Sequence, residues 1–218
     1  MERREKINII LDLDQSILSA EVLVKDEEDE EEEEEIYDID KNRLKASFFN
    51  FWNMDNYYVI FERPGLQKFL DFLFKNFNVS VWTAASKSYC MFIVENILIQ
   101  NRPERKLDHV FFSYHCKLSS KMKKGTKDLS MLWDVYKIPQ FNSKNTIILD
   151  DYDEVSETNN SEISTEPWKC IFAKPFYFTE EGSENDDFLK ILTKQLKIEK
   201  QNLLRGDVNA VRRIVHNS

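Results

Sequence analysis

Short apolar runs alternate along the chain with stretches in which apolar residues recur at helical spacing. The runs that predict buried strands lie at residues 7–11, 57–61, 78–83, 109–112, 146–151 and 168–172. Helices are predicted after residues 63–65, at 86–100, at 127–136 and from 186 onward. Strands that alternate with helices are typical of βαβ units, so we expect an α/β fold with a mostly parallel sheet.

The helical pattern is clearest after Arg63 and Pro64. Its apolar positions follow the i, i+3, i+4, i+7 spacing at Leu66, Phe69, Leu70, Leu73, Phe74 and Phe77. Pro64 suits a helix start, and we expect Arg63 to fix the turn before the helix. The stretch between the first strand and residue 56 is predicted to be irregular.

Two aspartates, Asp12 and Asp14, stand at the end of the first apolar run. Side chains alternate between the two faces of a strand, so Leu13 points one way and both carboxylates point the other. Two like charges at the edge of a sheet are costly unless a cation, a nucleophilic reaction or a proton transfer uses them. The alternative is a plain acidic turn that ends the strand.

Two later apolar runs also end in polar groups, Thr83 after one and Asp150 with Asp151 after the other. In open parallel sheets, ligands bind outside the carboxyl ends of the strands, so these groups can converge with the first pair. Carboxylates suit a hard cation such as Mg²⁺, while Thr83 and Lys127 suit anionic oxygens. A phosphate held partly by the metal is the expected substrate, although each residue alone also fits a surface turn.

The net charge of −9 comes from one segment of the 218-residue chain. Residues 26–35 are ten consecutive acids, and outside them 29 acidic residues face 30 basic ones. Such a run repels itself and cannot pack, so we expect a disordered loop there. The alternative is a contact for a basic partner or a mimic of a nucleic-acid backbone.

Composition excludes several other classes of protein. Four glycines and no glycine-rich motif exclude a phosphate loop, and three widely spaced cysteines fit neither disulfides nor a zinc site. Without a signal peptide or an apolar stretch near 20 residues, the chain is expected to be soluble and intracellular, in the nucleus or the cytoplasm, with no membrane contact. The densest basic stretch, residues 117–127, is expected to be a solvated loop or the border of an anionic substrate, and no direct nucleic-acid binding is expected.

Five short motifs carry a resemblance to a known family. They are D-L-D-x-[ST] at 12–16, R-P-G at 63–65, V-W-T-A-A at 81–85, K-D-L-S at 127–130 and L-D-D at 149–151. In this order they resemble the haloacid-dehalogenase (HAD) superfamily. Within it, the chain is similar to the phosphatases of the RNA polymerase II C-terminal domain (CTD), the NLI-interacting-factor-like family of FCP/SCP type. The resemblance covers about residues 7–195.

The resemblance implies a Rossmann-like HAD fold, with a mostly parallel sheet flanked by helices, no large cap domain and a flap inserted after the first strand. The phosphatase domain would cover residues 1–198, with the acidic loop 26–35 inserted, and residues 199–218 would form a helical tail. The implied activity is Mg²⁺-dependent removal of phosphate from phosphoserine or phosphothreonine of a phosphorylated protein or peptide.

The resemblance also implies roles for single residues. Asp12 would be the nucleophile that forms an aspartyl-phosphate, and Asp14 would protonate the leaving group and then activate water. Thr83 would hydrogen-bond a phosphoryl oxygen, and Lys127 would stabilise the charge on the phosphoryl group. Ser16 would support the phosphate or the geometry of the loop.

For the metal, the resemblance implies that Asp12, Asp150 and the backbone carbonyl of Asp14 ligate Mg²⁺. Asp151 would act on those ligands or reach the ion through a water molecule.

The chain departs from the family at three places. Gln15 stands where the family usually has Glu, and residues 113–116 lack the Arg-Glu pair that small members carry before a cysteine. The acid run lies where relatives have the flap. It would disfavour an acidic substrate or select a basic one.

Two alternatives to a protein phosphatase stay open. The same core serves phosphatases of nucleic-acid ends or of small phosphate esters, against which the lack of a basic channel argues. A non-catalytic binding module is the other alternative. The presence of Asp12, Asp14, Thr83, Lys127 and Asp150 argues against it.

Overall fold

A five-stranded parallel sheet forms the centre of the computed structural model, which describes residues 6–23, 37–38, 41–123, 125–163 and 165–218. The strand order is β6-β5-β1-β7-β8, and every pairing within it is parallel. The strands are β1 (Asn8–Leu11), β5 (Asn78–Trp82), β6 (Leu107–Phe111), β7 (Thr146–Asp150) and β8 (Cys170–Phe172). This confirms the predicted mostly parallel sheet.

The central strand β1 shows why the apolar runs are continuous. It pairs with β5 on one side and β7 on the other, and both faces of the sheet are covered. Ile9 and Leu11 belong to the apolar core on one face, while Ile10 belongs to the core on the opposite face. A strand buried on both faces cannot alternate between apolar and polar residues, which explains the unbroken run.

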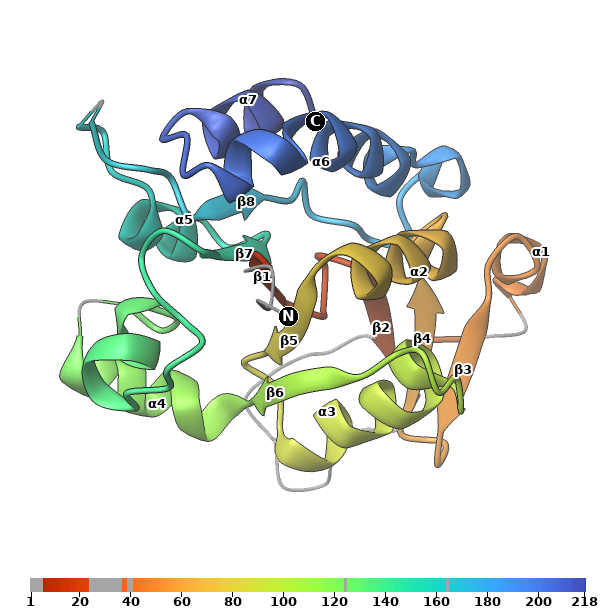
Figure 1. Cartoon of the computed structure of the whole chain (residues 1–218). Coiled ribbons are helices and arrows are strands. Elements are labelled where there is room, and N and C mark those ends of the chain that lie inside the picture. The colour runs from red at the N-terminus through yellow and green to blue at the C-terminus, as the bar shows by residue number, and fades with distance from the viewer. Residues whose placement is uncertain (1–5, 24–36, 39–40, 124, 164) are drawn as a thin grey trace.

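Helices cover the two faces of the sheet unequally. The larger core lies against α2 (Leu66–Asn76), α3 (Lys87–Ile93) with its π-helical continuation η1 (Val94–Ile99), α6 (Phe188–Leu204) and α7 (Ala210–His216). The smaller core lies against α4 (Ser113–Met122), the π-helical turn η2 (Met131–Val135) and α5 (Asp153–Asn159). In Figure 1, α6 and α7 lie together along one side of the molecule, and α4 lies well away from them.

A second, antiparallel sheet is inserted between β1 and β5, with strand order β2-β4-β3. It consists of β2 (Leu18–Val22), β3 (Phe51–Met54) and β4 (Tyr58–Glu62), with the short helix α1 (Arg43–Ala46) beside it (Figure 1). The prediction of an irregular stretch up to residue 56 was therefore wrong. β2 pairs with β4, which lies far along the chain. β3 is close to β4 in sequence, but it has four residues and none of them is buried, so its apolar pattern is weak.

The small sheet has an aromatic core of its own. Phe61 of β4 stacks on Phe178 with ring centroids 3.6 Å apart, and Tyr37 and Phe49 contact both rings edge-on. These rings tie the inserted sheet to the segment that follows β8. The insertion thus forms the flap expected after the first strand.

The structure differs from the predicted secondary structure at three further places. The basic stretch 117–127, expected as a loop, lies largely in α4, whose buried residues are only Cys116 and Ser119. Helix α5 was not predicted, because only Val155 and Asn159 are buried on it. The helix predicted at 127–136 is reduced to η2.

The C-terminal segment is helical, as predicted, and is part of the larger core. Helix α6 runs without a break across residue 198, and Ala210, Val211 and Ile214 of α7 are buried against the same core. The division at 198/199 stays a prediction, and the acidic loop 26–35 lies outside the described residues. Within the described part of the chain, no helix is long and apolar enough to span a bilayer.

Candidate functional site

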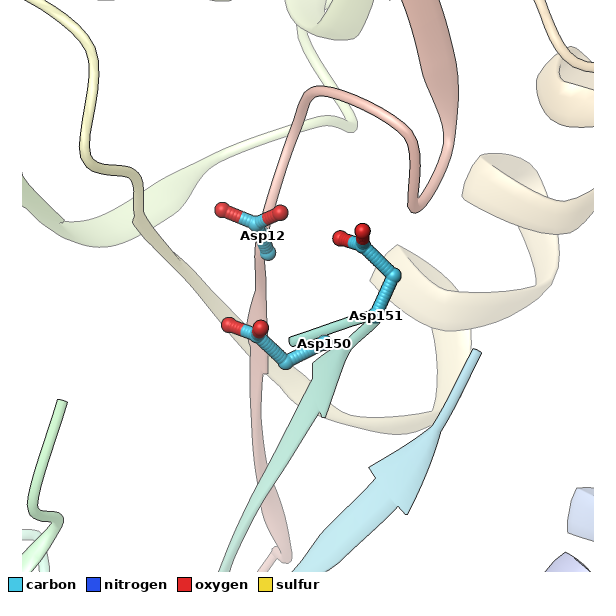
Figure 2. A group of neighbouring side chains, drawn as sticks. All are labelled: Asp12, Asp150 and Asp151. Atoms are coloured by element: carbon cyan, nitrogen blue, oxygen red, sulfur yellow. The ribbon is translucent and has the colours of Figure 1, made fainter. Parts of the chain in front are cut away.

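The carboxyl ends of β1 and β7 place three aspartates side by side. Leu11 pairs with Leu149, so Asp12 and Asp150 extend from neighbouring strands at the same edge of the sheet. Figure 2 shows the carboxylates of Asp12, Asp150 and Asp151 turned toward one another. One oxygen of each lies within 4.8 Å of the others, which makes this group a candidate cation site.

Lys127 lies between two of these carboxylates. Its Nζ is 2.6 Å from Asp12 Oδ1 and 2.7 Å from Asp150 Oδ2, and all three side chains are buried. Burial by itself lowers the pKa of Lys127, but the charges and hydrogen bonds of Asp12 and Asp150 outweigh it and raise the pKa above its usual range. The side chain is therefore a permanent buried cation.

The backbone around Lys127 is fixed by Asn159 of α5. The Asn159 side chain donates to the carbonyl of Lys127 at 2.9 Å and accepts from the amide of Leu129 at 3.0 Å. It also donates to the carbonyl of Val155, so its amide group makes three hydrogen bonds in a buried position. A fully bonded amide of this kind positions the loop that carries Lys127.

Ser16 joins the other side of the carboxylate group. Its Oγ is 3.2 Å from Asp12 Oδ2 and 2.9 Å from Asp151 Oδ1. A hydroxyl carries one proton, so Ser16 donates to one of the two carboxylates, and it bonds to both only when the other carboxyl group is protonated and donates to Ser16 Oγ. Burial of Ser16 and these contacts favour its predicted part in the loop geometry.

Asp150 and Asp151 are crowded carboxyl groups. Burial first, and then the charge of Asp12, raise the pKa of Asp150 to about 7 and that of Asp151 to about 6. A bound cation would remove this repulsion. An all-oxygen donor set of this kind suits Mg²⁺, so the residues present fit the predicted metal.

Asp14 lies outside that group and faces a cavity. Burial raises the pKa of its carboxyl to about 6, and a hydrogen bond from the Tyr89 hydroxyl opposes the shift. A carboxyl group with this pKa is protonated in part near neutral pH, as a general acid requires. Its backbone carbonyl as a metal ligand stays a prediction.

Thr83 follows β5 directly and is buried. Its Oγ1 accepts a hydrogen bond from the amide of Ala85 at 3.0 Å. The hydroxyl keeps its own proton for a further acceptor, as the predicted phosphate contact requires. Because β5 pairs with β1, Thr83 lies at the same edge of the sheet as Asp12, and its contact with phosphate stays a prediction.

Arg63 holds the loop after β1 in place. It donates to the carbonyls of Ser16 and Lys174 at 2.8 and 2.9 Å, and it forms a two-pronged ion pair with Asp186 at 2.9 Å. The guanidinium is fully buried and lies over the ring of Phe188. Its role reaches beyond the predicted turn before α2, because it links three distant segments.

Sequence reasoning missed three of these partners, Tyr89, Asn159 and Asp186. Tyr89 is 75 residues from Asp14, and Asn159 is 32 residues from Lys127. Only Asn159 had a signal in the sequence: it follows Val155 by four residues, so on a helix the two side chains lie on the same buried face.

Comparison with known proteins identifies relatives along nearly the whole chain. The model of the family described as NLI interacting factor-like phosphatase matches residues 7–206. CTD phosphatase-like protein 355R of Invertebrate iridescent virus 6 is 43% identical over 185 residues, which cover 84% of this chain and 92% of the viral protein. Its namesake in Invertebrate iridescent virus 3 is 38% identical over 209 residues, which cover 92% and 97%.

Among solved structures, the fold is similar to that of Fcp1, described as an essential RNA polymerase II CTD phosphatase. The TM-score is 0.50 at 18% identity, and the match covers 96% of this chain and 52% of that chain. A fission yeast Fcp1 variant bound to beryllium fluoride matches with the same TM-score and identity, over 99% and 58%. The chain spans little more than half of these solved chains, and at this identity the likeness shows the fold alone.

Replacing Arg63 tests its structural role. We expect Arg63→Gln to lower the free energy of unfolding by about 3 kcal/mol, because Asp186 and two carbonyls lose a buried partner. Arg102→Gln is the matched control, since Arg102 pairs with Asp71 on the surface and should contribute less than about 1 kcal/mol. Urea unfolding measures both, and equal losses in the two variants would contradict the assignment.

The crowded carboxyl groups predict a pH dependence of stability. Asp14, Asp150 and Asp151 have folded pKa values of about 6, 7 and 6 against an ordinary 3.8, so the folded state binds more protons within this window. Without Mg²⁺, their contribution makes the free energy of unfolding fall as the pH rises from about 4 to about 7.

Urea unfolding across this pH range, with EDTA or with Mg²⁺, measures the effect. Asp14→Asn should remove part of the fall in the free energy of unfolding. The difference between this variant and the unaltered chain gives the contribution of Asp14, separate from that of carboxylates elsewhere. Mg²⁺ should reduce the fall by neutralising Asp150 and Asp151. A slope that neither Asp14→Asn nor Mg²⁺ changes would contradict the prediction.

Proposed function

Because the chain belongs to the NLI interacting factor-like phosphatase family, we propose that it is a Mg²⁺-dependent protein phosphatase acting on phosphoserine or phosphothreonine. The reaction would pass through an aspartyl-phosphate on Asp12. The observation that carries the proposal is the placement of Asp12 between the Lys127 ammonium and the Ser16 hydroxyl, with Asp14 two residues away facing the cavity.

In the first step, a carboxylate oxygen of Asp12 attacks phosphorus in line with the leaving oxygen. A bond forms between Asp12 and phosphorus while the bond from phosphorus to the serine or threonine oxygen breaks. Lys127 and Ser16 contact different oxygens of Asp12, and so fix the orientation of the carboxylate before substrate arrives. Holding the nucleophile in this way lowers the entropic part of the barrier.

Asp14 handles the protons in both steps. It gives its proton to the leaving alcohol, and then takes one from the water that attacks phosphorus and releases Asp12. The pKa of about 6 suits both directions near neutral pH. The hydrogen bond from Tyr89 holds the carboxyl group toward the cavity.

Charge on the phosphoryl group is met by Lys127 and by the hydroxyl of Thr83. Asp12, Asp150 and the carbonyl of Asp14 would hold Mg²⁺, with Asp151 beside the ion or joined to it by water. Bound there, the ion would neutralise part of the phosphate charge.

The descriptions of the relatives support the proposed substrate class. The solved neighbours are described as phosphatases of the RNA polymerase II CTD, and a phosphorylated protein segment of that kind is the substrate we propose here. It would be met in the nucleus or the cytoplasm. A phosphorylated nucleic-acid end or a small phosphate ester is the alternative on the same core.

An aryl phosphate assay tests the chemistry. Turnover should require Mg²⁺ and stop with EDTA, and Asp12→Asn should lower kcat/KM by about 10³-fold or more. Asp108→Asn, an exposed carboxylate on β6, is the matched control and should retain full activity. Turnover that survives Asp12→Asn, or that needs no metal, would overturn the mechanism.

Phosphopeptides compared with 3′-phosphorylated oligonucleotides test the substrate class in the same preparations. We expect kcat/KM to favour the peptides. A preference for the oligonucleotides would show instead that the substrate is a phosphorylated nucleic-acid end.

A further inference from the structure

A cavity of about 820 Å³ lies between the small sheet and the start of α3. Asp14 is part of its lining, which also includes residues 19–22 of β2 and Asp55 in the β3–β4 turn. A peptide whose phosphoserine reaches Asp12 and Asp14 therefore has this cavity beside it.

The lining is acidic and aromatic. Besides Asp14, it carries the carboxylates of Glu21 and Asp55, and none of the described residues that line the cavity is Lys, Arg or His. Glu21 accepts one hydrogen bond, from Ser19 at 3.2 Å, and no described cation is paired with Glu21 or Asp55. An anionic wall of this kind repels acidic side chains and attracts basic ones.

Four tyrosines also line the cavity: Tyr57, Tyr58, Tyr89 and Tyr177. Tyr58 and Tyr89 contact each other edge-on with ring centroids 5.4 Å apart, so their positions are fixed next to Asp14. Tyrosine faces bind the methylene stem of a lysine or arginine and attract its charge. Aromatic rings and carboxylates together suit a long cationic side chain better than a purely apolar one.

The backbone presents Asp55 at a fixed place. Asp55 and Asn56 have φ angles of 50° and 63°, and the amide of Tyr57 donates to the carbonyl of Met54 at 2.9 Å. This is the two-residue hairpin turn in which both central residues are left-handed. Asparagine is favoured at such positions, so Asp55→Asn removes the charge without disturbing the turn.

We infer that this cavity selects phosphopeptides that carry a lysine or arginine within a few residues of the phosphorylated serine or threonine, with Glu21 and Asp55 as the selecting groups. The inference rests on the proposed phosphatase function and names the substrate class of that site. It is independent of residues 26–35, for which the sequence suggests the same preference but which lie outside the described part of the chain.

A phosphopeptide series tests the selection. Each peptide has one phosphoserine in a neutral background and a single Lys, Gln or Glu at one of the three positions on either side. At one position or more, Lys should raise kcat/KM about fivefold over Gln, and Glu should lower it. The preference should shrink as salt is added.

Matched variants assign the effect to the cavity. Glu21→Gln with Asp55→Asn should bring the Lys and Gln peptides within about twofold of each other, while aryl phosphate turnover stays unchanged. Glu104→Gln with Asp108→Asn removes the same charge from exposed positions outside the cavity and should keep the preference. The single variants Glu21→Gln and Asp55→Asn replace the pair if it does not fold.

Binding of the labelled peptides to the Asp12→Asn chain, followed by fluorescence anisotropy, gives a readout that needs no turnover. Tighter binding of the Lys peptide, lost in the Glu21 and Asp55 variants, supports the inference. Equal turnover and equal binding of all peptides overturn the inference and leave the phosphatase function standing. If neither aryl phosphate nor peptide is hydrolysed, the proposed function fails, and the binding comparison alone decides the selection.

Discussion

A buried cation between two carboxylates is the interaction on which the site depends. Lys127 contacts Asp12 and Asp150, and little of any of the three side chains is exposed to solvent. Without that charge, the carboxylates at the ends of β1 and β7 would repel each other where water cannot screen them. Asn159 of α5 holds the backbone of Lys127, and α5 begins shortly after Asp150, one of the two carboxylates that Lys127 contacts. The other carboxylate, Asp12, comes from the end of β1.

Much of the parallel sheet and most of its site follow from sequence because two simple rules act together. Strands that are buried on both faces have continuous apolar runs in the sequence, as residues 9–11 and 147–149 show. Parallel strands bring their carboxyl ends to one edge, so the polar residues that follow those runs must meet there. Asp12, Asp150 and Asp151 meet in this way, and Lys127 and Ser16 contact them.

The rest depends on contacts that no local pattern encodes. Strand β2 is defined by pairing with β4, far along the chain, and the aromatic rings that hold the small sheet come from residues as far apart as Phe61 and Phe178. Tyr89 and Asn159 matter because folding brings them to Asp14 and to the loop of Lys127. The cavity for which we infer substrate selection also depends on such contacts, because it lies between the inserted sheet and α3.

Locating the phosphoryl group during turnover tests the central claim, that Asp12 is the nucleophile. The protein is mixed with excess phosphate ester and Mg²⁺, quenched in the steady state, reduced with borohydride and digested for mass spectrometry. An aspartyl-phosphate is reduced to homoserine, so the account predicts homoserine at position 12 in the unaltered chain and none when substrate is omitted. Homoserine at the position of another aspartate would contradict the account. So would an unmodified Asp12 in protein that is turning over substrate under conditions in which hydrolysis of the phosphoenzyme is the slow step.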